Sequence, residues 1–194
     1  MELLFSERKL NSIIYLVKLI ISGYEWEVNM DIRVLEKRDA KAYKKLRLEA
    51  LQTNPAAFAS SYEEEKDFTL ENFENRLTNS SAYTFGAFEE GELNGVVTLQ
   101  LEQKVKLKHR TNLVAMYVTT EKRGKGIAKK LIQEAIKRAE KLEDIEQIYL
   151  SVSANNTPAK SLYNSLGFTI YGIDRRALKI DNTYLDEELM VLFL

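Results

Sequence analysis

The sequence contains no cysteine and a single histidine, His109, among its 194 residues. Without cysteine there can be no disulfide bond, thiolate nucleophile, iron-sulfur cluster or cysteine zinc site, and one histidine cannot build a histidine-rich metal site. We therefore expect no metal. The chemistry that remains must come from carboxylates, tyrosine, serine or threonine, lysine or arginine, backbone groups or a bound cofactor.

An excess of charge of either sign is also missing, since 28 lysines and arginines stand against 29 aspartates and glutamates, for a net charge of -1. No overall basic field attracts nucleic acid or anionic lipid, so neither nucleic acid nor a membrane is expected as a partner. The contents of 45% hydrophobic and 29% charged residues are typical of a soluble globular enzyme or binding domain, for which we expect a cytoplasmic location.

The apolar stretch 13–21 is too short to span a bilayer, for which about 20 apolar residues are needed, and Lys18 interrupts it. A secretory signal is not expected either, because Glu2 replaces the basic start that such a signal needs. We interpret residues 1–29 as an N-terminal extension, expected to be helical, that covers an apolar surface or makes a subunit contact. A homodimer is one of the alternatives left open.

A second hypothesis takes Met30 as the natural start of the protein. Codons assumed for residues 26–30 contain a sequence that resembles a bacterial ribosome-binding site directly before the start codon. The protein would then be bacterial, and the 30–194 domain would be its functional part.

Residues 31–194 show no repeat and no proline-rich linker, so a single domain is expected. Hydrophobic periodicity predicts, in chain order, a strand at 31–34, a helix at 40–51, short helical segments starting near Ser61 and Thr69, a hairpin at 83–101, a strand at 113–118, a helix beginning near Gly124, a strand at 148–152, a helix at 158–166, and strands at 168–178 and 184–194. The run 113–118 is continuously apolar, which is typical of a strand buried on both faces. The predicted fold class is α/β (α+β), with a mixed, mostly antiparallel, twisted sheet flanked by helices on both faces.

The segment 116–130 joins a strand, a glycine-bearing loop and a helix. Gly124 and Gly126 allow close backbone approach, and the exposed amides and dipole of a first helical turn favour an anion. A dinucleotide fingerprint would need a third glycine where Lys129 stands, and a Walker loop needs a longer glycine spacing. The alternative interpretation is a glycine-lined turn with a solvated basic helix start.

A second segment, 152–168, reads Val-Ser-Ala-Asn-Asn-Thr-Pro-Ala-Lys-Ser-Leu-Tyr-Asn-Ser-Leu-Gly-Phe. The two segments together, in this order and separation, resemble the GNAT superfamily of N-acetyltransferases. That superfamily has a Gln/Arg-x-x-Gly-x-Gly/Ala pyrophosphate loop followed by an Asn-x-x-Ala-x-x-Leu-Tyr-x-x-x-Gly-Phe helix. The resemblance covers most of residues 31–194 and implies the GNAT fold. Glu121 departs from the pattern, because it stands where the family usually has Gln or Arg.

The resemblance implies acetyl-CoA as the acetyl donor and assigns roles to residues of both segments. The resemblance implies that the pyrophosphate is bound by the amides of Arg123, Gly124, Lys125, Gly126, Ile127 and Ala128. It implies that the pantetheine arm and the thioester carbonyl contact the backbones of Met116, Tyr117 and Val118. It also implies that Asn156 contacts the cofactor and that Tyr163, near the sulfur, is the acid. The residues themselves leave two alternatives open: Asn156 as a helix cap and Tyr163 as a half-buried aromatic.

The implied reaction is direct acetyl transfer from acetyl-CoA to an amine of a small molecule or peptide. An alkylammonium with a pKa of about 10.4 is almost fully protonated at neutral pH, so the reaction needs a base or a lowered pKa of the amine. Glu63, Glu64 and Glu65 are candidates, although a solvated first helical turn is the preferred explanation. His109 could relay a proton, although a hairpin or surface histidine is preferred. The alternative function is a non-catalytic module that binds CoA or acyl-CoA as a sensor on the same fold. A third, weaker reading is a protein-interaction domain that binds an incidental anion.

Overall fold

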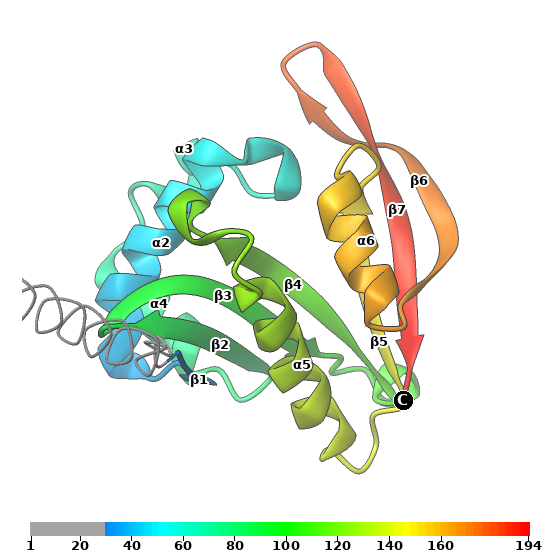
Figure 1. Ribbon diagram of the computed structural model, residues 1–194, viewed down its shortest axis with the longest axis horizontal. Helices are drawn as coiled ribbons and strands as arrows, with labels where there is room; N and C mark the ends of the chain where they lie inside the picture. The colour runs from blue at the N-terminus through cyan, green and yellow to red at the C-terminus, as the bar shows by residue number, and fades with distance from the viewer. Residues whose placement is uncertain (1–29) are drawn as a thin grey trace, which may run out of the picture. The chain divides into compact units, whose positions relative to one another are not determined.

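A seven-stranded sheet with the order β1-β2-β3-β4-β5-β7-β6 forms the centre of the computed structural model, which describes residues 30–194 (Figure 1). The expectations for residues 1–29 lie outside the described residues. The strands are β1 (Asp31–Val34), β2 (Ala82–Glu89), β3 (Glu92–Leu101), β4 (Arg110–Val118), β5 (Gln147–Ser153), β6 (Thr169–Ile180) and β7 (Thr183–Phe193). Neighbouring strands are antiparallel except for β4 and β5, so the predicted mixed, mostly antiparallel sheet is confirmed.

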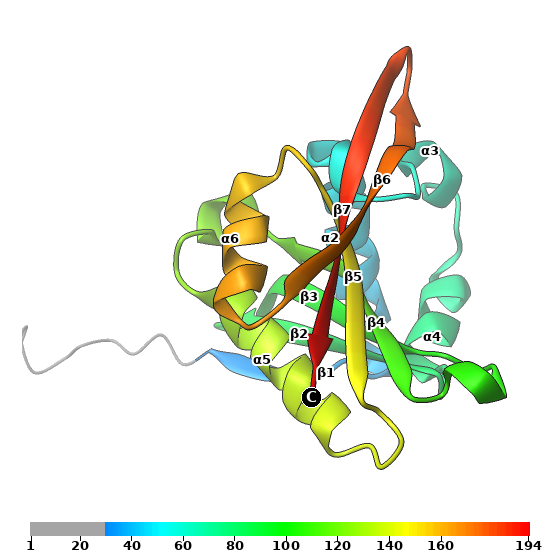
Figure 2. The ribbon, with the colours of Figure 1, turned by 90° about the vertical axis from the view of Figure 1, so that its right-hand side faces the viewer.

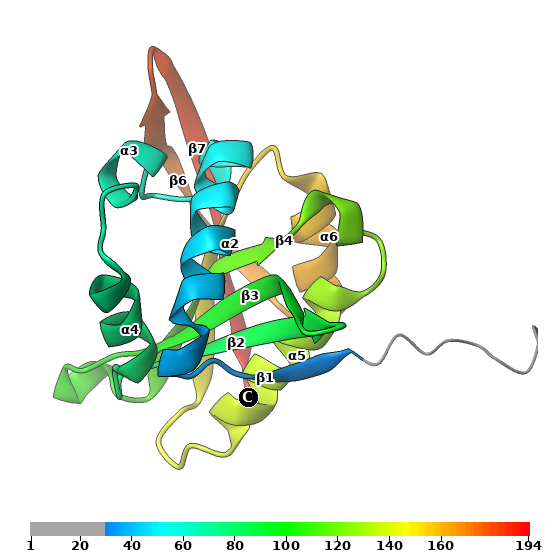
Figure 3. The ribbon, with the colours of Figure 1, turned by 90° about the vertical axis from the view of Figure 1, so that its left-hand side faces the viewer.

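Helices cover both faces of the sheet, as predicted. One face carries α2 (Ala40–Thr53), α3 (Tyr62–Glu65) and α4 (Leu70–Thr78), and the other carries α5 (Ile127–Glu140) and α6 (Thr157–Ser165) (Figures 2 and 3). Single 3-10 turns complete the described part of the chain: η1 (Lys37–Asp39), η2 (Pro55–Ala57), η3 (Val105–Leu107) and η4 (Thr120–Lys122).

Short polar residues set the helix starts where the sequence predicts them. The Ser61 hydroxyl accepts a hydrogen bond from the Glu64 amide at 3.3 Å, and the Glu64 carboxylate accepts one from the Ser61 amide at 2.6 Å. Thr69 and Asn72 make the same reciprocal pair at the start of α4. Each cap satisfies amides that the first helical turn leaves without a partner. Gly167, with φ +92°, ends α6 in the left-handed conformation that glycine adopts without a Cβ clash.

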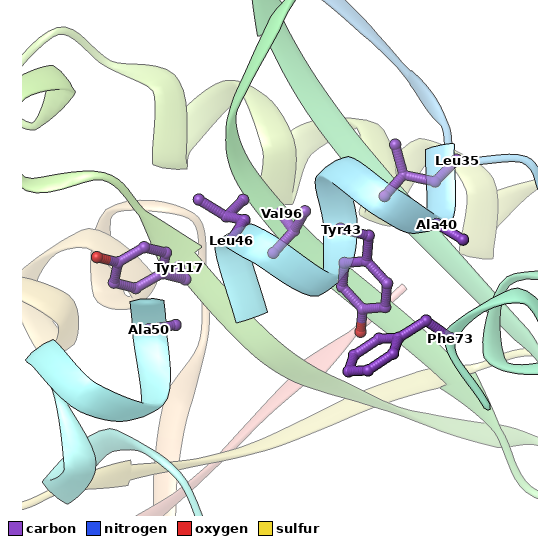
Figure 4. Packing of buried hydrophobic residues seen from close by; sticks show 8 residues of the cluster. All are labelled: Leu35, Ala40, Tyr43, Leu46, Ala50, Phe73, Val96 and Tyr117. Atoms are coloured by element: carbon purple, nitrogen blue, oxygen red, sulfur yellow. The ribbon is translucent and has the colours of Figure 1, made fainter. Parts of the chain in front are cut away.

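A hydrophobic cluster fixes α2 against the sheet (Figure 4). Tyr43, Leu46 and Ala50 recur at helical spacing and are all buried, as the periodicity predicts. The cluster consists of Leu35, Ala40, Tyr43, Leu46, Ala50, Phe73, Val96 and Tyr117. Because Tyr117 belongs to β4 and Ala50 to α2, this packing holds the C-terminal end of α2 close to the C-terminal end of β4.

The prediction that residues 113–118 are buried on both faces is wrong. Val114 is 38% exposed, and Ala115 has a positive φ of 54°. The register between β3 and β4 shifts at this point, so Ala115 and Met116 together oppose only Val97. This two-against-one pairing is a β-bulge, which bends a strand and redirects its side chains.

The bulge lies where β4 separates from β5. The two parallel strands pair only through Arg110–Asn112 and Gln147–Tyr149, and no pairing follows Asn112 within residues 30–194. The C-terminal half of β4 therefore presents an edge without a strand partner, and a space opens between the two strands.

Candidate functional site

A cavity of ≈ 700 Å³ lies between the C-terminal ends of β4 and β5. Its wall combines the end of α2 with η2, the end of β4, the start of α5, the end of β5 and the first turns of α6. The lining residues are Thr53, Asn54, Pro55, Ala56, Ala57, Phe58, Met116, Tyr117, Val118, Arg123, Ala128, Ser153, Asn155, Asn156, Pro158, Ala159, Leu162 and Tyr163. The structure thus brings both sequence segments to one cavity.

A recess of ≈ 220 Å³ adjoins this cavity at the start of α5 and includes Gly124, Gly126 and Ile127 in its wall. Both glycines have φ +78°, so α5 begins at Ile127 rather than near Gly124. A Cβ built on either glycine would meet no atom within 4 Å. The backbone amides of the loop therefore border open space at the positive end of a helix, which is where a phosphate group binds.

The two basic residues of the loop differ in their contacts. Arg123 donates from Nε to the Val118 carbonyl at 2.9 Å and from Nη2 to Asn54 Oδ1 at 2.7 Å. Its guanidinium also lies 5.4 Å from the centre of the Tyr117 ring. These contacts tie the loop to β4 and to the segment after α2. Lys125 lines neither the cavity nor the recess and is exposed, so it contributes a solvated charge at the helix start.

Tyr163 and Asn156 meet the cavity from α6. Tyr163 is buried, at 7% exposure, and packs edge to face on Phe168 with ring centres 5.8 Å apart. Burial raises the pKa of Tyr163 to about 12, so its hydroxyl keeps its proton at neutral pH. Asn156 Oδ1 accepts from the Ala159 amide at 3.2 Å, which confirms the helix-cap interpretation of this residue.

Tyr117 joins the cavity wall to α2 through its hydroxyl, which donates to Glu49 Oε1 at 2.9 Å. The same hydroxyl lies 3.0 Å from Thr53 Oγ1. Burial raises the pKa of Tyr117; the hydrogen bond with Thr53 opposes this shift, and the hydrogen bond to Glu49 adds to it. This hydroxyl therefore acts as a fixed connection between α2 and β4.

The three acidic residues considered as bases all have other partners. Glu63 forms an ion pair with Lys66, and Glu64 caps α3 through Ser61. Glu65 is buried, which corrects the expectation of a solvated turn, and it accepts hydrogen bonds from Arg47 and Arg76 at 2.8 Å each. Burial alone would raise the pKa of Glu65, but these two bonds outweigh it and lower the pKa from 4.5 to about 2. A carboxylate held in this way is a poor base.

His109 lies too far from the cavity to relay a proton there. It directly precedes β4, whose C-terminal end lines the cavity, and nine residues of strand span about 30 Å. Its carbonyl accepts a hydrogen bond from the Glu146 amide at 2.7 Å, at the end of the sheet where β5 begins. The surface interpretation of His109 therefore fits the structure.

The lowered pKa of Glu65 predicts a specific acid sensitivity. Its contribution to stability is fully present above the unfolded-state pKa of 4.5 and is lost as the pH falls toward the folded-state value of about 2. Between pH 6 and pH 3 we expect Glu65 to account for a loss of about 2 kcal/mol of unfolding free energy. Urea unfolding across this range measures the loss, and Glu65→Gln should flatten the dependence; an equally steep curve for that variant would contradict the assignment.

Among residues 30–194, no helix has both the length and the apolar content needed to cross a membrane. In the same part of the chain, no three acidic or histidine side chains form a group that could hold a metal ion.

A helix start with open space beside its amides, adjoining a cavity between separated strands, is an arrangement that suits a phosphate-bearing ligand along the edge of a sheet. The chain belongs to the GNAT acetyltransferase family, because the family model described as acetyltransferase (GNAT) domain matches residues 32–189. The predicted family is thereby confirmed.

Known proteins resemble this chain in sequence and in fold. An N-alpha-acetyltransferase from Sulfurisphaera tokodaii is 30% identical over 103 residues, which cover 50% of this chain and 62% of that relative. The GNAT-family acetyltransferase from Streptococcus pneumoniae has a TM-score of 0.77 at 24% identity and covers 86% of this chain and 100% of its own. The protein yncA from Salmonella typhimurium, solved with its cofactor acetyl-CoA, has a TM-score of 0.74 at 22% identity, covering 86% of this chain and 94% of its own. The two structures show that the fold is shared.

The sequence predicts an acceptor pocket built from the loops around 54–65 and 179–184. The first loop lines the cavity through residues 54–58, next to Thr53, whereas no residue of 179–184 is among the lining residues. Ser153 and Asn155, in segment 152–168, also line the cavity, although the family motif implies no role for them. The Asn54-Pro55 turn signal by itself predicts only a loop, because no residue near it in the sequence shows that β5 and α6 lie across the cavity from it.

Proposed function

We propose that this protein transfers the acetyl group of acetyl-CoA directly to an amine of a small molecule or peptide. The observation that carries the proposal is the recess at Gly124 and Gly126, which adjoins the cavity lined by Tyr163 of α6. Family membership supports the reaction class. The relative named an N-alpha-acetyltransferase and the neighbour solved with acetyl-CoA support the amine acceptor and the donor, respectively.

The residues present fit acetyl-CoA. Amides from Gly124 to Ala128 would hold the pyrophosphate, since Gly124 and Gly126 leave open space beside the backbone. The Arg123 amide already donates to the Thr120 carbonyl at 3.3 Å. In the described part of the chain, the edge of β4 at Met116, Tyr117 and Val118 has no strand partner and would offer backbone groups to the pantetheine arm and to the thioester oxygen, except for the Val118 carbonyl, which accepts from Arg123. A fixed amide at that edge would stabilise the negative charge that develops on this oxygen.

Tyr163 would serve the leaving sulfur. A thiol has a pKa of about 8.5, well below the value of about 12 for Tyr163, so a complete proton transfer from tyrosine to thiolate is uphill. We therefore propose that the hydroxyl donates a hydrogen bond to the sulfur as charge accumulates there and passes a proton only as another proton replaces it. This role depends on the hydroxyl and not on the ring.

Tyr163→Phe should slow the chemical step by about 100-fold, the lower end of what positioned proton donors contribute. The ring stays in place, so acetyl-CoA affinity should change little. Single-turnover acetyl transfer, measured beside the dissociation constant for CoA, separates the two effects. Tyr171→Phe, which removes a hydroxyl from a 55% exposed tyrosine, is the matched control. A wild-type rate in Tyr163→Phe would leave Tyr163 as a packing residue.

The experiment that tests the proposed function is thiol release from acetyl-CoA in the presence of three amines: a peptide with a free N-terminus, a free L-amino acid and spermidine. Release that depends on the amine supports the transferase. Calorimetric binding of CoA without release for any amine would instead favour the non-catalytic acyl-CoA sensor. Absence of CoA binding would exclude both.

A further inference from the structure

Glu187 on β7 lies next to the cavity wall formed by Ser153. The two residues are direct partners in the antiparallel pairing of β5 with β7. Directly opposed residues project to the same face of a sheet, with Cβ atoms about 4.5–5.5 Å apart. Because Ser153 lines the cavity, the Glu187 side chain starts one strand away from it on the same face.

Glu188, the next residue of β7, shows which face of the sheet the Glu187 side chain lies on. Glu188 forms an ion pair with Lys160 of α6 at 2.9 Å, so Glu188 projects toward the α6 side of the sheet. Side chains alternate along a strand, so Glu187 projects to the opposite side, which carries α2 and α3 (Figure 2). Tyr163 approaches from α6. Tyr163 and Glu187, which is one strand beyond the cavity wall at Ser153, thus lie on opposite faces of the sheet.

Glu187 also differs from the other carboxylates around it. Asp186 accepts from the Arg176 amide at 2.8 Å, and Glu188 is paired with Lys160. Within residues 30–194, half-buried Glu187 makes no hydrogen bond or ion pair, and its partner across β6 is another carboxylate, Asp174. Like charges placed opposite each other destabilise a sheet, and a cation between them relieves the repulsion.

Resting on the proposed function, we propose that Glu187 is the catalytic base that receives the acceptor amine as an ammonium ion and removes its first proton. This assigns the acceptor to the class of positively charged alkylamines, with Asp174 adding a second negative charge beside it. Glu49, Glu63, Glu64 and Glu65 are each engaged elsewhere, as described above, which leaves Glu187 as the unengaged carboxylate beside the cavity wall.

Glu187 takes one proton from the ammonium, and the freed nitrogen pair forms the C–N bond while the carbonyl pair moves to oxygen. The oxygen pair then re-forms the carbonyl as the C–S bond breaks and its pair stays on sulfur. Tyr163 gives its proton to sulfur and regains one from the second nitrogen proton. The proton on Glu187 passes to water, so the products are the amide, the CoA thiol and one released proton.

The test compares an ammonium acceptor with a nucleophile that needs no base. Glu187→Gln keeps the size and removes the charge, and it should lower kcat about 100- to 1,000-fold with the fastest of the three amines named above. With methoxyamine, which is neutral at the assay pH, the loss should stay below about 10-fold. Calorimetric affinity for CoA should be unchanged. Asp181→Asn makes the same charge change at the hairpin turn, about 20 Å along the strand, and is the matched control.

Each outcome decides the proposal. Partial recovery in Glu187→Asp, combined with the selective loss for ammonium acceptors, supports a base. An unaffected Glu187→Gln, or an equal loss with methoxyamine, would overturn it in favour of no role or a structural one. A wild-type protein that binds CoA but releases no thiol with any amine refutes the proposed function, and with it the role of Glu187.

Discussion

Gly126→Glu is expected to abolish acetyl-CoA binding while the chain stays folded. The substitution places a carboxylate in the recess where the pyrophosphate should lie. Repulsion between unit charges about 4 Å apart near a protein surface is worth about 4 kcal/mol, or roughly a 1,000-fold loss of affinity. A Cβ at this position meets no protein atom within 4 Å, so the fold itself has room for the side chain. Gly124→Glu should behave in the same way.

The structure offers a matched control for backbone strain. Gly91, in the turn between β2 and β3, has φ +82° and equally open surroundings. Gly91→Glu therefore carries the same cost of about 1–2 kcal/mol for a left-handed residue without approaching the recess. Calorimetry with acetyl-CoA and thermal unfolding should show that both variants are folded and that only Gly126→Glu fails to bind. Wild-type affinity in a folded Gly126→Glu would remove the basis for the cofactor assignment.

Glu65→Ala is expected to lower the unfolding free energy by about 3–5 kcal/mol. The change leaves Arg47, whose side chain is 9% exposed, as a buried charge without its carboxylate partner. Arg47 also lies 4.9 Å from the Phe58 ring, which forms part of the cavity wall, so loosening this cluster reaches the site. Urea unfolding followed by circular dichroism measures the loss.

Glu63→Ala is the control for Glu65→Ala, since it removes a neighbouring carboxylate that is 73% exposed and paired with Lys66. Surface pairs contribute less than about 1 kcal/mol, so this variant should unfold close to the wild type. Arg76→Ala provides a second measurement should Glu65→Ala not fold: it removes one of the two arginines, keeps the pair of Glu65 with Arg47, and should cost less. Equal stability of Glu63→Ala and Glu65→Ala would contradict the buried-pair account.

The sequence predicted the elements whose conformation depends on residues close together in the chain. Helical spacing of Tyr43, Leu46 and Ala50 predicted α2, and the glycines before Ile127 predicted a loop suited to an anion. Both features depend on residues close together in the sequence. The burial of Glu65 was not predictable in this way. Three consecutive glutamates read as solvated, and only tertiary packing brings Arg47 and Arg76 to one of them.

The bulge in β4 and the position of Glu187 also depend on the whole sheet. Residues 113–118 are uniformly apolar, so nothing in them marks Ala115 as the point where the register shifts. Glu187 and Ser153 are far apart in sequence and become neighbours only through the pairing of β5 with β7. The candidate cofactor site could therefore be predicted from motifs, whereas the candidate base required the register of distant strands.

Because β4 and β5 pair over only a short length, the sheet consists of two parts, called plates here, that are joined at this one short contact. Only three residue pairs, at Arg110, Thr111 and Asn112, connect the plate β1-β2-β3-β4 to the plate β5-β7-β6 through strand pairing. Beyond Asn112, the outward backbone groups of β4 have no strand partner within residues 30–194; the Val118 carbonyl accepts from Arg123, and the others are left for water or a ligand. Under the proposed function, the amides of the pantetheine arm would supply the partners that a neighbouring strand supplies elsewhere, so cofactor binding would connect the two plates.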